Sequence, residues 1–167
     1  ICMGKSLFLT VIYAVCSLCY MAAQGLVNVK HYSVKDGMSQ NTVQGVLQDN
    51  EGYIWMATWN GLEKFDGYSF KNYKTYPTDK VKLQYNRLVN LQLGGNQMLV
   101  CQSYDRRVYL FDIRRECFED VFVYHPEVKL CTAASKIITL PNGMVWIVGT
   151  NGDLWRIDCF RDKDKGG

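Results

Sequence analysis

The order of apolar and polar residues predicts a four-stranded antiparallel sheet within residues 43–73. Residues 43–48 alternate between apolar and polar side chains, as a half-buried strand does, and residues 53–58 form a denser apolar run that is typical of an interior strand. Two further strands are expected at 62–65 and 68–73. Turn-forming residues separate the four runs, namely "DNEG", Asn60-Gly61 and Asp66-Gly67. The Asn-Gly pair favours a two-residue type I′ turn.

The same pattern recurs twice further along the chain. Residues 140–158 repeat the glycine turn, the tryptophan and a second Asn-Gly, whereas residues 93–112 keep the glycine turn and the apolar strand but have Leu99 at the tryptophan position. The aligned residues Trp55, Leu99 and Trp146 are 44 and 47 residues apart. A period in the mid-forties with four strands per unit is typical of a β-propeller blade.

The sequence therefore predicts an all-β fold, a partial β-propeller of about three four-stranded antiparallel blades. The blade units are expected at about 43–73, 87–121 and 132–158, within an incomplete propeller that covers 25–167. An incomplete ring leaves sheet faces and edges open, so remaining blades or further copies of the same chain are expected to cover them.

The first residues of the chain have the pattern of a secretory signal peptide at 3–24. Lys5 is the only charged residue before Lys30, and it is followed by an apolar run that ends at the small residues Ala22 and Ala23. Met3 is the expected start, because Ile1 is not an ordinary initiator. A retained membrane anchor is the alternative, although the run is shorter than the roughly 20 residues that span a bilayer. The chain is therefore expected to be exported.

Composition and charge narrow the class of partner. The chain has 167 residues, of which 48% are hydrophobic and 21% are charged, and this balance is typical of an ordered globular protein. The formal net charge is +3, and no cluster of lysine or arginine stands apart from the acidic residues around it. Nucleic acid is therefore not an expected partner.

The cysteines after the leader leave two interpretations open. Cys101, Cys117, Cys131 and Cys159 could form disulfides in an oxidising compartment, or they could be free thiols within strands. We expect no metal and no other cofactor, because the histidines at 31 and 125 are not at ligand spacing from a cysteine.

Residues 36–73 resemble a known family. The residues that carry the resemblance are Asp49, Gly52, Ile54, Trp55, Thr58, Asn60, Gly61, Leu62, Phe65, Asp66 and Gly67. They are similar to the blade motif of two-component regulator propeller repeats, which build the periplasmic sensor region of hybrid two-component regulators. The chain departs from this motif at Ala57, where glycine is usual, and at Asp153, where leucine is usual.

The resemblance implies a signalling role. Members of the family have a leader, two periplasmic propellers, an immunoglobulin-like domain, a transmembrane helix and cytoplasmic histidine kinase modules, and they often detect oligosaccharides. We therefore expect the N-terminal part of a sensing domain on the periplasmic side of the inner membrane of a Gram-negative bacterium. Its ligand is expected to be an oligosaccharide derived from a polysaccharide, and the alternative is a stand-alone secreted propeller-like binding module.

The resemblance also bears on the two ends of the sensing domain. The segment 26–34 is expected to pair as a strand with the last blade of the ring, and the membrane is expected to be reached only through the leader or downstream parts. No kinase motif lies in this chain, and neither His31 nor His125 is assigned as a phosphoacceptor.

Aromatic and acidic residues are the remaining candidates for a site. Trp55 and Trp146 recur at the same blade position, which favours a packing role, whereas Trp59 is not repeated and is the better candidate for a contact at the rim. The sequence assigns no ligand-binding residue.

Three carboxylates are candidates for the catalytic pair of a glycosidase. Asp49, Glu51 and Glu63 have positions that turn geometry explains, so we expect no catalytic residue. Asp162 and Asp164 resemble the start of a calcium loop, but the remaining oxygen ligands are missing and a solvated tail is expected there.

Overall fold

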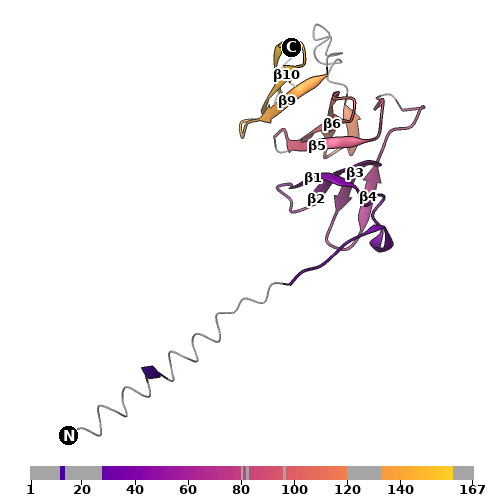
Figure 1. Cartoon of the computed structure of the whole chain (residues 1–167), viewed down its shortest axis with the longest axis vertical. Coiled ribbons are helices and arrows are strands. Elements are labelled where there is room, and N and C mark those ends of the chain that lie inside the picture. The colour runs from indigo at the N-terminus through magenta and orange to yellow at the C-terminus, as the bar shows by residue number, and fades with distance from the viewer. Residues whose placement is uncertain are drawn as a thin grey trace, which may run out of the picture. The chain divides into compact units, whose positions relative to one another are not determined.

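The computed structural model of the chain describes residues 12–13, 28–79, 81, 83–95, 97–119 and 133–159 (Figure 1). The chain divides into two compact units, Ile1–His31 and Tyr32–Gly167. Most of the predicted signal peptide lies outside the described residues. Within the described ranges, no helix is long and apolar enough to cross a membrane.

The second unit contains three antiparallel sheets, which follow one another along the chain. The first sheet consists of β1 (Val43–Gln48), β2 (Ile54–Thr58), β3 (Gly61–Phe65) and β4 (Phe70–Tyr73). The second sheet consists of β5 (Leu88–Leu93), β6 (Met98–Ser103), β7 (Val108–Asp112) and β8 (Cys117–Glu119). The third sheet consists, in the described residues, of β9 (Ala134–Thr139), β10 (Met144–Gly149) and β11 (Leu154–Asp158). The predicted all-β fold with successive blade-like sheets is confirmed, with four strands in each of the first two.

The three sheets share one register. In each sheet the first and second strands pair with a β-bulge at the same place, opposite the end of the second strand. The residues that end the second strand are Thr58, Ser103 and Gly149, which are 45 and 46 residues apart. Since a bulge fixes register and twist locally, its recurrence shows that the sheets are copies of one unit.

This register corrects the predicted alignment by one residue. Three positions before the bulge lie Trp55, Val100 and Trp146, so Val100 and not Leu99 occupies the tryptophan position of the second sheet. The sequence was ambiguous here because Leu99 and Val100 are both buried, and both faces of the second sheet are covered. A strand that is buried on both faces lacks the alternation from which register is read.

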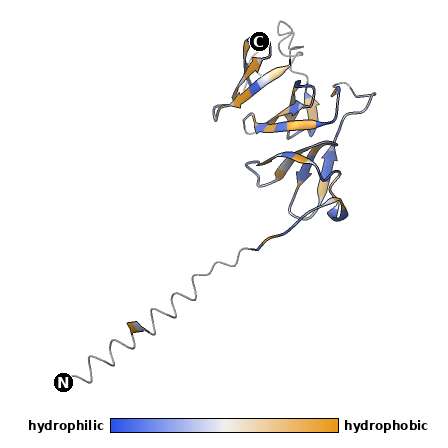
Figure 2. Cartoon of the chain, viewed as in Figure 1, coloured by the Kyte–Doolittle hydropathy of each residue, from blue (hydrophilic) through white to orange (hydrophobic). Residues whose placement is uncertain are grey.

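Two buried apolar clusters join neighbouring sheets. Trp55 is fully buried against the second sheet, where its ring centroid lies 5.4 Å from that of Phe111. On the other face of the second sheet, Val100 packs with Val145 and Ile147 of the third sheet. Figure 2 shows the apolar residues along the strands of all three sheets. Trp55 therefore packs against the next sheet, as predicted.

The segment before β1 covers the opposite face of the first sheet. The ring centroid of Tyr32 lies 4.9 Å from that of Phe65 and 5.6 Å from that of Phe70. A single 3-10 turn, η1 (Val34–Asp36), follows with a capping box at Ser33. The described residues 28–33 form no strand, so the strand expected at 26–34 is absent from this part.

The turn between β2 and β3 differs from the predicted type I′ geometry. Gly61 has a φ of 108°, but Asn60 does not have a positive φ, which a type I′ turn requires at both central residues. Thr58 stabilises the turn instead, because its hydroxyl accepts a hydrogen bond from the Asn60 amide and donates one to the Gly61 carbonyl.

Candidate functional site

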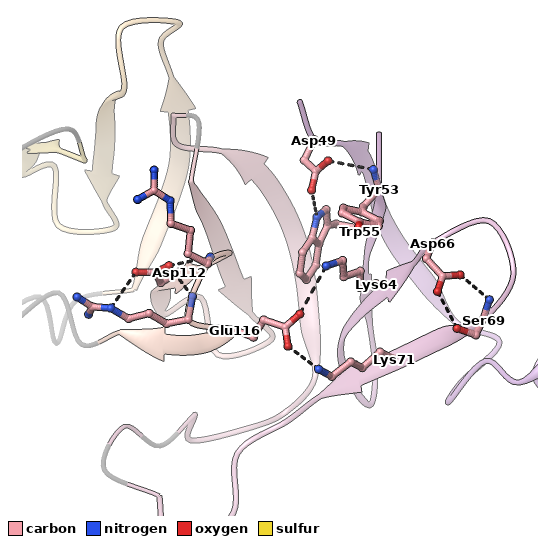
Figure 3. Close-up of polar contacts among 11 residues, drawn as sticks. Asp49, Tyr53, Trp55, Lys64, Asp66, Ser69, Lys71, Asp112 and Glu116 are labelled. Carbon is pink, nitrogen blue, oxygen red and sulfur yellow. Dashed lines mark hydrogen bonds and ion pairs between the residues drawn. The ribbon is translucent and has the colours of Figure 1, made fainter. Parts of the chain in front are cut away.

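Asp49 organises the turn between β1 and β2. Its carboxylate accepts a hydrogen bond from the Glu51 amide at 2.9 Å. It also accepts hydrogen bonds from the Tyr53 amide, at 3.0 Å, and from the indole Nε1 of Trp55, at 2.7 Å (Figure 3). The side chain is buried. Each of these contacts holds the backbone or the packed tryptophan, so Asp49 is part of the scaffold.

The other two candidate carboxylates do not join Asp49 in one site. Glu63 is fully buried on the face of the first sheet opposite to Trp55, where it accepts a hydrogen bond from the Ser39 amide. Its Oε2 atom has no hydrogen-bond partner among the described residues. Glu51 is exposed on the turn. The structure therefore brings together no pair of these carboxylates.

An ion-pair cluster crosses from the first sheet to the second. Glu116, in the turn between β7 and β8, contacts the ammonium groups of Lys71 and, at 3.5 Å, Lys64 (Figure 3). The Lys64 ammonium also lies 3.9 Å from the centre of the Tyr53 ring. The hydrogen bond from Lys71 is the main cause that lowers the pKa of Glu116 below its ordinary value. This cluster links β3 and β4 of the first sheet to the turn between β7 and β8 of the second.

A groove of about 520 Å³ lies beside this cluster, between β4, β8 and the segment after β4. Its walls include Tyr73, Tyr76 and Phe118 as well as Glu116. The charge of Glu116 is already compensated by the two lysines. The groove thus offers aromatic surface, but this carboxylate is not free to bind a ligand.

A second cluster lies where β2 and β6 end. The guanidinium carbon of Arg87 is 3.5 Å from the centre of the Trp59 ring and 4.6 Å from the centre of the Tyr104 ring. Trp59 directly follows β2, Arg87 directly precedes β5 and Tyr104 directly follows β6. The Tyr104 amide donates a 2.9 Å hydrogen bond to the Arg87 carbonyl, which fixes the two residues together. We call Trp59, Arg87 and Tyr104 the arginine–aromatic cluster.

The arginine–aromatic cluster carries an uncompensated positive charge within the described part of the chain. No hydrogen bond or ion pair of the Arg87 guanidinium is found there, and its Nε atom is buried without a partner. The neighbouring acid, Asp105, is engaged by the Ser103 hydroxyl and by the Arg107 guanidinium at 3.3 Å. A guanidinium between two aromatic rings is stabilised by cation–π attraction, yet its N–H groups still require acceptors.

Within the described ranges, neither the cysteines nor the potential metal ligands form a further candidate site. Cys101, Cys117 and Cys159 are free thiols, and burial raises the pKa of Cys159 to about 11. Within the described residues, no three His, Cys, Asp or Glu side chains form a cluster that could hold a metal ion. Cys131, His125, Asp162 and Asp164 lie outside the described residues.

Comparisons with solved structures identify the fold. A structure described as the extracellular domain of the hybrid two-component system BT3049 from B. thetaiotaomicron superposes with a TM-score of 0.63 over 78% of this chain, at 23% identity. The extracellular domain of BT4673 from B. thetaiotaomicron gives a TM-score of 0.52 over 75% of the chain, at 23% identity. The chain has the fold of a part of these extracellular domains. The resemblance that was read from the blade motif is therefore confirmed at the level of the fold.

A curated relative matches the sequence of this chain over a shorter stretch. Histidine kinase P4 from Formosa agariphila is 41% identical over 54 residues, which is 32% of this chain. The chain spans 4% of the length of that relative, 19% of the BT3049 chain and 17% of the BT4673 chain. No protein-family model matches the chain.

Sequence reasoning found one of the three residues of the arginine–aromatic cluster. Trp59 was singled out because it is not repeated, and it is 42% exposed in the structure. Arg87 and Tyr104 were missed, although the common register would have placed Tyr104 at the position of Trp59. Tyr104 occupies in the second sheet the position that Trp59 has in the first. The Trp59 amide donates a hydrogen bond to the Thr42 carbonyl, and the Tyr104 amide donates one to the Arg87 carbonyl. Thr42 and Arg87 each directly precede the first strand of their sheet.

Proposed function

We propose that this chain contributes blades to the extracellular ligand-sensing domain of a two-component regulator. The chain has no catalytic role in this proposal and acts on the periplasmic side of the membrane of a Gram-negative bacterium. The observation that carries the proposal is the recurrent register of the three sheets, combined with their likeness to extracellular domains of hybrid two-component systems.

The proposed ligand is an oligosaccharide derived from a polysaccharide. The apolar C–H faces of sugar rings stack on aromatic side chains, which combine a flat apolar surface with a polar edge. Trp59 and Tyr104 are 42% and 62% exposed, whereas the scaffold residues Trp55 and Phe111 are fully buried. These observations favour the arginine–aromatic cluster as the ligand contact.

The third sheet supports the proposal that further blades follow. Trp146 is half-buried on the face of this sheet that points away from the second sheet, together with the exposed side chains of Ile138 and Leu154. Trp146 pairs across the strands with Arg156, as Trp55 pairs with Lys64 in the first sheet. We propose that this face receives a further blade, as the first sheet receives the second.

The coding sequence beyond Gly167 tests the proposed function. We expect additional Trp and Asn-Gly blade motifs, followed by a membrane span and histidine kinase motifs. A stop codon directly after Gly167, together with a stable secreted product, would instead favour a stand-alone secreted binding module.

Absence of catalysis is tested separately. Incubation of the chain with polysaccharides should release no reducing ends above a heat-treated control. Turnover that is lost in Glu51→Gln would overturn this part of the proposal, because Glu51 is exposed whereas Asp49 and Glu63 are buried.

A further inference from the structure

The arginine–aromatic cluster departs from the repeat that builds the rest of the unit. The positions equivalent to Arg87 are Thr42 before the first sheet and Ala133 before the third, and the position equivalent to Trp59 and Tyr104 in the third sheet is Thr150. The arginine is therefore found in the second sheet alone among the three, whereas an aromatic ring recurs in the first two. Since its copies lack it, the arginine is not part of the shared blade scaffold and is free to serve a ligand.

The charge of the cluster indicates which ligand. A guanidinium that is partly withdrawn from water has a large cost unless acceptors satisfy its N–H groups. Arg87 has no acceptor in the described part of the chain, and its Nε atom is buried. The turn that follows Tyr104 also holds the exposed Arg106, while its acid, Asp105, is engaged by Arg107. The local field thus favours an anion, and a guanidinium binds carboxylate and sulfate oxygens in bidentate fashion.

We propose that the arginine–aromatic cluster binds an anionic saccharide, a sugar ring that carries a carboxylate or a sulfate group. Arg87 takes the anionic group, and the open parts of the Trp59 and Tyr104 rings take the apolar face of the sugar. The choice of a saccharide rests on the proposed function, whereas the preference for an anion rests on the unpaired guanidinium. A neutral oligosaccharide would offer hydroxyl oxygens as acceptors but would leave the charge of Arg87 without a counter-ion.

Calorimetric titration of the full chain with three tetrasaccharides tests the inference. The probes are a uronate tetrasaccharide, a sulfated galactose tetrasaccharide and an unsulfated galactose tetrasaccharide. At least one anionic probe should bind roughly tenfold or more tightly than the neutral probe, because a charge-assisted bidentate contact is stronger than a hydrogen bond to a neutral hydroxyl. The two anionic probes distinguish a carboxylate from a sulfate as the group bound.

Variants separate a binding role from a structural one. Arg87→Gln should weaken the anionic probe by roughly tenfold while it leaves the neutral probe unchanged, and Arg87→Lys should lose less because it keeps the charge. Trp59→Ala and Tyr104→Ala should weaken both kinds of probe. Arg114→Gln is the matched control, since it removes an exposed arginine from the turn between β7 and β8.

The outcomes distinguish this inference from the proposed function. Equal binding of neutral and anionic probes that depends on Trp59 would overturn the anionic preference and leave an oligosaccharide sensor in place. Anionic binding that Arg87→Gln does not weaken would overturn the site. Binding of no saccharide at all would overturn both. A loss of thermal stability in Arg87→Gln without any change in affinity would show that Arg87 only holds the two turns together.

Discussion

At the scale of single residues, Asp49 is a candidate catalytic carboxylate whose hydrogen bonds are all structural. Its two oxygens accept three hydrogen bonds within one turn, including the bond from the indole of the fully buried Trp55. Loss of that acceptor leaves a buried N–H group without a partner, which costs about 1–3 kcal/mol.

We predict that Asp49→Ala lowers the free energy of unfolding by about 2–3 kcal/mol, because it removes the indole acceptor and the support of the turn at once. Urea unfolding of the full chain, followed by tryptophan fluorescence, measures the change. Glu51→Gln is the control, since the Glu51 side chain is exposed, and it should shift the free energy by less than about 0.5 kcal/mol. Equal effects of the two substitutions would show that the bonds to Asp49 do not stabilise the fold.

At the scale of elements, two glycines in one sheet distinguish backbone strain from steric overlap. Gly61 and Gly67 have φ values of 108° and 97°, in the left-handed region. A Cβ atom at Gly61 would overlap with the Tyr73 carbonyl, whereas a Cβ atom at Gly67 would meet nothing within 4 Å. Gly61 is therefore required for two reasons, its backbone angle and the lack of space for a Cβ atom. Gly67 is required only for its backbone angle.

We predict that Gly67→Ala destabilises the chain by about 1–2 kcal/mol and that Gly61→Ala does so by more. Thermal unfolding followed by circular dichroism compares the two variants directly. A smaller effect for Gly61→Ala than for Gly67→Ala would contradict the close approach of β3 to the end of β4.

The ion-pair cluster between the first two sheets predicts a dependence on pH. The pKa of Glu116 is lowered below its ordinary value of 4.5, chiefly by Lys71, so the folded state favours the carboxylate. This contribution is present above the unfolded pKa and is lost as the pH falls through the lower, folded pKa. It is modest, since the Glu116 side chain is 32% exposed.

We predict that Glu116→Gln lowers stability by about 0.5–1 kcal/mol at pH 7 and that the difference from the wild type disappears in acid, below the folded pKa. Urea midpoints of both proteins from pH 2.5 to pH 7 give this difference. A difference that is constant over the whole range would show that Glu116 acts through packing and not through its charge.

At the scale of the whole unit, the sequence predicts the sheets well and the site poorly. The alternation of residues 43–48 and the glycine turns identify strands because only one sheet face is open there, whereas the position of Leu99 was misread because both faces of β6 are covered. Arg87 was missed for another reason. It lies 28 residues from Trp59 along the chain, and only the packing of the first sheet on the second brings the two together.

The last prediction concerns the two tryptophans that share a blade position. Trp55 is covered by the second sheet, and Trp146 lies half-buried on the outward face of the third. We predict that Trp55→Ala lowers the free energy of unfolding by about 3–5 kcal/mol or abolishes cooperative unfolding, and that Trp146→Ala lowers it by about 1 kcal/mol. The two losses differ because the loss of stability grows with the buried apolar surface that the substitution removes. Urea unfolding at two protein concentrations measures both variants. Equal losses that grow with protein concentration would mean that a second copy already covers Trp146. Equal losses at every concentration would contradict the open face and, with it, the proposal that a further blade packs there.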